Sequence, residues 1–429
     1  MATAPTSATI RTYHVGFGDC FLLSFQYSRK SERHLLIDFG STGLPKGVPK
    51  SRMMDIAKDI KQRTGGKLHA VVATHRHRDH ISGFATDKSG QATGNVIKSL
   101  KPHLVVQPWT EDPKLGPDAT GPSGSNANNK KFGAGTSKQI AALSLMHVVA
   151  HQSRAARNLP KDLRPEIGFL GETNIANPSA VRNLMKMAKN AYVYCGSKSG
   201  LETVLPGVKV EVLGPPTLKQ TDSIRKKRSR DPDEFWHFQV GATALAARAE
   251  NERATLFPRY VESRGYSQRI NARWLIHHAR TVRGEQLLEI VRSLDQEMNN
   301  TSVILLFQVG EKKLLFPGDA QIENWQYALA QQRYQSLLAS VNLYKVGHHG
   351  SLNATPKSLW KLFKTKSEEK TADRLLSLMS TMEGKHGTVS SQTEVPRVKL
   401  VRELARESDL FTTQQLKGKD FFHDTVVTF

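Results

Sequence analysis

The stretch LHAVVATHRHRDH, residues 68–80, decides the fold expected of this chain. Its first half is a short apolar run that predicts a buried strand. Its second half places histidines two positions apart, and side chains at that spacing on an extended backbone point the same way. His75 and His77 can therefore reach one metal ion together. A turn after His77 would bring Asp79 and His80 toward a neighbouring ion.

Chance is a poor explanation of this spacing. The chain has 16 histidines among its 429 residues. Three histidines and one aspartate at these fixed offsets should arise by accident in roughly one chain in a thousand. A solvated loop rich in His and Arg is the alternative. Imidazole and carboxylate ligands together favour zinc, with manganese or iron as further candidates.

Other candidate ligands share one feature, a position directly after an apolar strand. They are Asp38, Asp319, His348 and His349. Taken alone, an aspartate at a strand end is more often a turn residue. Ligands in α/β folds collect at the carboxyl edge of the sheet, so the shared position predicts that these side chains meet the histidine-rich stretch there.

The chain is strongly basic, with 61 Lys and Arg against 39 Asp and Glu and a formal net charge of +22. Such an excess favours an anionic partner, which could be nucleic acid, a nucleotide or anionic lipid. A basic surface without a specific partner is the alternative. Two cysteines, no signal peptide and no long apolar segment predict a cytoplasmic protein without a membrane span or a disulfide framework.

Segments with α/β character lie in two distant pieces, residues 8–110 and 299–429, together with a core strand at 208–216. Residues 111–207 predict a mostly helical insertion. Residues 217–298 predict a second, largely helical insertion, which is basic and carries Arg interleaved with aromatic residues. Arginine beside aromatic rings suits phosphate contact and base stacking, although an amphipathic helix with a solvated Arg face explains it equally well.

Hydrophobic periodicity predicts the individual elements. We expect helices at residues 137–156, 179–191 and 324–332, and strands at residues 302–307 and 342–346. No internal repeat is detectable in the sequence.

In its motifs the chain resembles the metallo-β-lactamase superfamily, and within it the hydrolase domain of ComEC-type DNA-uptake proteins and their stand-alone relatives. The matching pieces, in chain order, are HVGFGDCFLL (14–23), LLIDFGS (35–41), THRHRDHISG (74–83), VEVLGPP (210–216), NNTSVILLF (299–307), LLFPGDA (314–320) and LYKVGHHGS (343–351). A closing strand, loop and helix match less closely between residues 375 and 413. The resemblance covers about half of the chain.

This resemblance implies an α/β fold of the αββα sandwich type, in which two mixed β-sheets are flanked by helices and metals bind at one edge. It also implies a site for two zinc ions that activates water. His75 and His77 would bind the first zinc ion, Asp79 and His80 the second, and Asp319 would bridge the two.

The resemblance also implies roles around these ligands. Asp38 would orient a ligand through a hydrogen bond. The remaining ligand of the second ion would be His348 or His349, and His348 is preferred because it comes first after the strand. Asp79 could in addition accept a proton during hydrolysis.

The expected substrate is a phosphodiester in DNA, RNA or a nucleotide. Lys345, Arg76 and Arg78 are the cationic residues nearest to the predicted ligands in sequence, and each could stabilise negative charge on such a substrate. Simple surface charge is the alternative for each of them.

Two departures from the family pattern stand out. Many members carry one more histidine for the first ion, between the histidine-rich stretch and the bridging aspartate. His103, His147, His151 and His237 lie in that interval, but none has a convincing sequence context. Relatives also commonly carry Gln at the position of Phe17.

Three functions therefore remain open. The first is a metal-dependent phosphodiesterase or nuclease. The second is a hydrolase of a small ester, a lactone or a phosphorylated metabolite on the same fold. The third is a nucleic-acid-binding module that has lost catalysis, against which the full set of ligands argues.

Overall fold

The computed structural model describes residues 4–115, 121–122, 177–217, 219–220, 298–351, 355–390, 394–417 and 420–429. The helix expected at residues 137–156 lies outside the described residues. Nearly all of the basic insertion, residues 217–298, lies outside them as well.

Among the described residues, the strands form two sheets. The first has the order β13-β1-β2-β3-β4-β5-β6, with bounds β1 (Ser7–Tyr13), β2 (Cys20–Ser28), β3 (Ser31–Phe39), β4 (Ala70–Val72), β5 (Leu104–Pro108), β6 (Lys189–Val193) and β13 (Phe422–Thr428). The second has the order β12-β11-β10-β9-β8-β7, with bounds β7 (Lys209–Gly214), β8 (Ile304–Val309), β9 (Lys312–Phe316), β10 (Leu343–Lys345), β11 (Leu376–Met379) and β12 (Asp409–Thr412).

The two sheets repeat one topology. In β1–β6 and again in β7–β12, consecutive strands are neighbours. The first two pairings of each set are antiparallel and the next three are parallel. Strands β3 and β4 of the first sheet therefore correspond to β9 and β10 of the second.

Alternation of side chains along β2 shows how the core is built. Phe21, Leu23 and Phe25 point between the two sheets. Cys20 and Leu22 point the other way, toward the helices that cover the first sheet. A strand with both faces covered reads as an almost continuous apolar run, as this one does.

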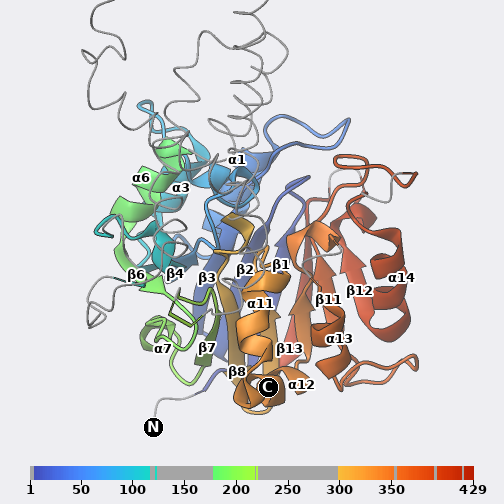
Figure 1. Cartoon of the computed structure of the whole chain (residues 1–429). Coiled ribbons are helices and arrows are strands. Elements are labelled where there is room, and N and C mark those ends of the chain that lie inside the picture. Colours follow the sequence, from blue (N-terminus) through green and yellow to red (C-terminus); the bar gives the residue numbers. More distant parts are fainter. Residues whose placement is uncertain are drawn as a thin grey trace, which may run out of the picture.

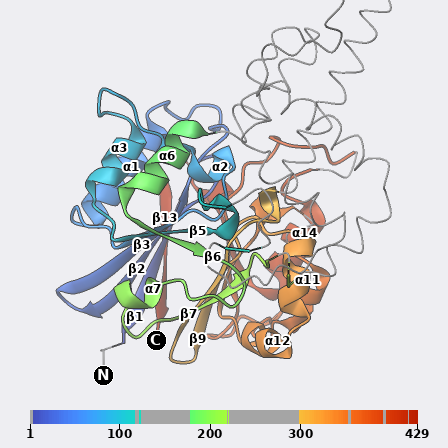
Figure 2. The ribbon, with the colours of Figure 1, turned by 60° about the vertical axis from the view of Figure 1, so that its left-hand side comes forward.

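Helices cover the outer face of each sheet (Figures 1 and 2). Those packed against the first sheet are α1 (Arg52–Arg63), α3 (Thr93–Ser99) and α6 (Pro178–Met187). Those packed against the second are α11 (Ile322–Leu329), α12 (Gln332–Ala339), α13 (Lys357–Leu362) and α14 (Val398–Glu407). The protein is thus an α/β structure with two mixed sheets flanked by helices, which agrees with the expected sandwich.

One boundary expected from sequence is wrong. Residues 178–207 were assigned to an insertion, yet they contribute α6, strand β6 and the short helix α7 (Leu201–Val204) to the core. The helix expected at 179–191 ends at Met187, and β6 begins two residues later. Parallel pairing of β6 with β5 overrides the local helical pattern there.

The helix expected at 324–332 corresponds to α11, which ends earlier than expected, at Leu329, and a second helix, α12, starts at Gln332. Among the described residues, no helix combines the length and apolar character needed to cross a membrane.

Candidate metal centre

The predicted ligands come from the carboxyl ends of four strands, two in each sheet. Asp38 lies near the end of β3, and the histidine-rich stretch follows β4. Asp319 follows β9, and the pair His348 and His349 follows β10. Contacts of His80 with Asp319 and of His349 with Asp79 show that these strand ends meet at one edge of the sandwich.

Local backbone conformation separates the members of the histidine-rich stretch. His75 and His77 lie on the segment between β4 and α2, which bends at Arg76. The short helix α2 (Arg78–Ile81) then begins and carries Asp79 and His80.

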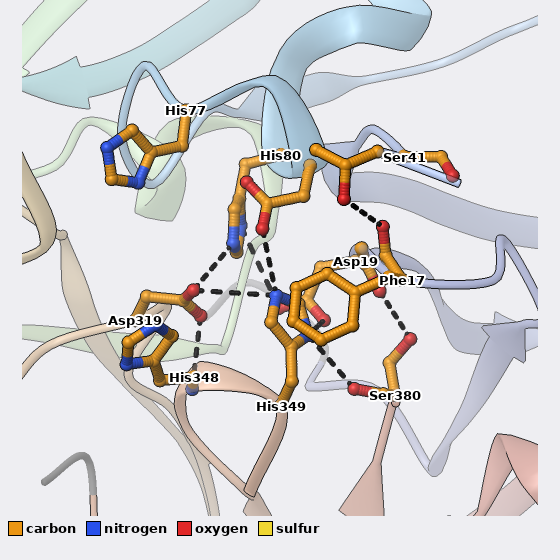
Figure 3. Close-up of polar contacts among 12 residues, drawn as sticks. Phe17, Asp19, Ser41, His77, His80, Asp319, His348, His349 and Ser380 are labelled. Carbon is orange, nitrogen blue, oxygen red and sulfur yellow. Dashed lines mark hydrogen bonds and ion pairs between the residues drawn. The ribbon is translucent and has the colours of Figure 1, made fainter. Parts of the chain in front are cut away.

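Four side chains converge on one point. Figure 3 shows three of them with labels, His80, Asp319 and His349. Asp79, His80, Asp319 and His349 each offer one ligand atom, and these atoms all lie within 4.8 Å of one another. Nε2 of His80 is 3.0 Å from Oδ2 of Asp319. Nε2 of His349 is 3.2 Å from Oδ2 of Asp79 and 3.6 Å from Oδ2 of Asp319. All four residues are buried.

Each of the two clustered histidines is oriented through its other ring nitrogen. Nδ1 of His80 donates to Oδ2 of Asp38 at 2.8 Å. Asp38 in turn accepts hydrogen bonds from the backbone N–H and the hydroxyl of Thr74, both at 2.7 Å. Nδ1 of His349 lies 3.0 Å from the carbonyl oxygen of Ser380, which can only accept. These contacts leave Nε2 of both rings for a ligand, which is the usual arrangement of metal-binding histidines.

The donor set fits a divalent transition metal. Two imidazole nitrogens and two carboxylate oxygens suit zinc, and they also suit manganese or iron. Oδ1 of Asp79 is buried and finds no hydrogen-bond donor among the described residues. A buried acceptor without a donor is costly, and a cation would satisfy it.

His75 and His77 lie next to this cluster. Nε2 of His75 is 3.0 Å from Nδ1 of His77, and the ring centroids of His75 and His80 are 4.2 Å apart. Burial lowers the pKa of His75, with the nearby charges of His80 and His77 acting in the same direction. A neutral imidazole is the form that binds metal.

The structure places His348 and His349 differently. Its backbone N–H donates to Oδ1 of Asp319 at 3.1 Å, but its ring Nδ1 lies 2.9 Å from the hydroxyl of Ser351. His349, not His348, belongs to the four-residue cluster. Both residues have positive φ, 41° and 52°. This left-handed turn is uncommon for residues other than glycine.

Two of the three predicted substrate contacts are buried and form ion pairs with carboxylates. Lys345 is 2% exposed and pairs with Asp19 and Asp319 behind the cluster. Arg76 is also buried and pairs with Glu111. Arg78, the first residue of α2, is half-buried.

Asp19 was missed in the sequence. It is fully buried, and its Oδ1 lies 3.5 Å from Nδ1 of His349. The signal available was the pattern Gly-Phe-Gly-Asp after β1, which lies within a matching motif. Phe17 of the same loop packs on His349, with ring centroids 4.3 Å apart.

Electrostatics in the cluster reflect the close approach of unlike charges. Burial would raise the pKa of Asp79 and Asp319, but the neighbouring His80 and His349 outweigh it and hold both pKa values below the usual range. Burial would lower the pKa of His80, but Asp319 and Asp38 outweigh it and raise that pKa well above the ordinary value. A metal ion would therefore replace a proton on this ring.

The additional histidine expected for the first ion is not found among the candidates that are described. His103 precedes β5, at the end of the strands opposite the cluster, and its ring packs near His69. The other three candidates, His147, His151 and His237, lie outside the described residues.

Comparison with known proteins adds no assignment. The chain matches no model of a known protein family and no curated protein sequence. Its function must therefore be argued from the geometry of the cluster.

Proposed function

We propose that this protein is a metal-dependent hydrolase in which Asp79, His80, Asp319 and His349 bind a divalent cation, with zinc the first candidate. The convergence of their four ligand atoms within 4.8 Å carries the proposal. When bound, a divalent cation supplies Lewis-acid activation of water and neutralises negative charge on the substrate.

A second cation is part of the proposal. His75 and His77 present ring nitrogens 3.0 Å apart beside His80. They would hold the first ion of a two-metal site, and Asp319 would bridge to the second. Two-metal sites are a common solution for hydrolysis of phosphate esters.

The chain's own residues supply orientation and proton transfer. Asp38 and the carbonyl oxygen of Ser380 fix the rings of His80 and His349. Asp79 would also accept the proton of the attacking water, through the carboxylate oxygen that does not bind the cation.

We propose a phosphodiester in nucleic acid or a nucleotide as the substrate. The net charge of +22 supports an anionic substrate, because a basic protein attracts polyanions from solution. The motif resemblance to DNA-uptake hydrolase domains supports the same class.

Metal analysis of the purified protein, combined with cleavage assays, tests this function. The assays use single-stranded DNA, RNA, cyclic dinucleotides and bis-p-nitrophenyl phosphate. We expect bound zinc and turnover of at least one phosphodiester, and we expect Asp319→Ala to lose both. Asp373→Ala changes an exposed aspartate in an ion pair with Lys312, and it should retain both.

The outcomes separate the three functions. Bound metal without phosphodiester turnover would move the substrate to a small ester, a lactone or a phosphorylated metabolite. Nucleic-acid binding without any turnover would favour a binding module. A wild-type protein that takes up no divalent cation would contradict the proposal itself.

A further inference from the structure

Lys345 is a buried lysine whose ammonium lies behind the metal-binding cluster. Its Nζ donates to the carbonyl oxygen of Gly318 at 3.0 Å and lies 3.5 Å from Oδ1 of Asp319. It forms a closer ion pair with Asp19. A charge buried this deeply needs a partner, because removing an ammonium from water costs several kcal/mol or more.

Asp19 connects the ion pair to the other ligand-bearing segments. Its carboxylate faces His349 at 3.5 Å. Its backbone N–H donates to the carbonyl oxygen of Asp79 at 2.9 Å, and its own carbonyl accepts from the N–H of Gly40 at 3.1 Å. The pair thus contacts three segments that carry proposed ligands.

The two oxygens of Asp319 are divided between different partners. Oδ1 faces Lys345 and accepts from the backbone N–H of His348 at 3.1 Å. Oδ2 faces His80 and His349 at 3.0 and 3.6 Å. The donors on one side therefore fix the rotation of the carboxylate so that the other oxygen points into the cluster.

Charge balance gives the ammonium a second effect. Among the described residues, Asp19, Asp38, Asp79 and Asp319 are buried together at this edge, with Lys345 as the only lysine beside them. The ammonium neutralises a carboxylate that lies outside the four-residue cluster. The negative charges of Asp79 and Asp319 therefore remain available to bind the cation.

We propose that Asp19 and Lys345 are positioning residues: they hold Asp319 and His349 in the arrangement that binds the cation, and Lys345 does not contact the substrate. This inference rests on the proposed function, because it needs a cation in the cluster. An ion pair that only stabilised the fold would change the melting temperature but leave the metal site unaltered.

The test measures metal binding by the full-length protein. Zinc affinity is determined by competition with a chelating dye, and the site geometry by the visible absorption spectrum of the cobalt-loaded protein. We expect Asp19→Asn to weaken zinc binding about 10- to 100-fold, the range found when a residue behind a metal ligand is changed. We expect Lys345→Met to alter the cobalt spectrum and to lower kcat at saturating metal, with KM for bis-p-nitrophenyl phosphate unchanged.

An exposed ion pair in the same sheet provides the matched control. Lys312 lies on β9, and its Nζ is 2.8 Å from Oδ1 of Asp373. Lys312→Met and Asp373→Asn repeat the two chemical changes away from the cluster. Both should bind zinc and cobalt as the wild-type protein does.

Several results would overturn the inference. Wild-type zinc affinity and an unchanged cobalt spectrum in both Asp19→Asn and Lys345→Met would do so while leaving the proposed function intact. A rise in KM alone for Lys345→Met would make Lys345 a substrate contact instead. If the wild-type protein bound no metal, the proposed function itself would be contradicted, and this inference would fail with it. If a single variant fails to fold, the double variant Asp19→Asn/Lys345→Met, which removes both charges together, is measured in its place.

Discussion

His348 and His349 are neighbours in sequence but present different groups to the cluster. His349 contributes a ring nitrogen, whereas His348 contributes its backbone N–H to Asp319. Substitution by alanine removes a ring and keeps the N–H. The two positions therefore allow a direct comparison.

We predict that His349→Ala weakens zinc binding by more than about tenfold, equal to about 1.4 kcal/mol or more, because a ligand is lost. His348→Ala should leave zinc affinity close to the wild-type value, because its contact to Asp319 is made by the backbone. Competition with a chelating dye measures both. If His348→Ala weakened zinc binding more than His349→Ala, His348 would be the ligand.

Single residues show what a sequence can and cannot predict. The pattern His-x-His-x-Asp-His indicates candidate ligands from the sequence alone, because few other functions need that spacing. The choice between His348 and His349 depends on a turn with positive φ, which no local pattern specifies. The direction of Lys345 depends on Asp19, which is more than 300 positions away in the chain and lies just before β2 of the other sheet.

At the scale of elements, close backbone contact brings the end of β3 against α2, the helix that carries Asp79 and His80. A Cβ atom at Gly40 would lie 2.4 Å from the carbonyl carbon of Asp79 and from the backbone nitrogen of His80. Backbone atoms cannot yield at that distance, so only glycine allows the end of β3 to approach α2.

We therefore predict that Gly40→Ala displaces α2 from β3, with a loss of stability of about 1–3 kcal/mol and weaker zinc binding. Gly43→Ala is the control from the same loop, because its Cβ would meet only the flexible ends of Lys385 and Met382. Denaturant unfolding and dye competition measure the two effects. If Gly40→Ala and Gly43→Ala had the same stability and the same zinc affinity, the close-packing explanation would be contradicted.

The elements themselves were predicted unevenly. Apolar runs with clear turns around them, such as β2 and β8, are evident in the sequence. Strand β6 was read as part of a helix, because its identity comes from pairing with β5 and not from its own residues. Strand β13 was not predicted. It pairs with β1, over 400 positions away.

At the scale of the whole molecule, the repeated sheet topology explains where the cluster lies. Corresponding strands of the two sheets end at one edge and supply the proposed ligands. The opposite edge carries a separate pair, His34 and His69. The backbone N–H of His34 donates to Nδ1 of His69 at 3.0 Å, so this nitrogen must be unprotonated.

This pair predicts a pH dependence of global stability. Burial, together with the charge of Arg33, lowers the pKa of His69 to about 4. The unfolded chain has a histidine pKa of about 6.5 and takes up the proton first as the pH falls. The contribution of His69 is therefore complete above about pH 6.5 and is lost as the pH falls toward 4.

His69→Asn tests this dependence, because Oδ1 of Asn can accept the same hydrogen bond but does not titrate. We expect the loss of unfolding free energy between pH 6.5 and 4 to shrink by about 1–2 kcal/mol, after allowance for solvent screening. His423→Asn, a half-buried histidine of β13, is the control. A pH profile identical to that of the wild-type protein would contradict the role of His69.

The central claim is that side chains from the ends of strands in both sheets bind one cation. An anomalous-difference map from crystals of the zinc-loaded protein tests it most directly. The claim predicts a peak about 2.0–2.2 Å from Nε2 of His80 and His349 and from carboxylate oxygens of Asp79 and Asp319. A map with no peak among these four residues would contradict it, whether or not zinc is bound elsewhere in the protein.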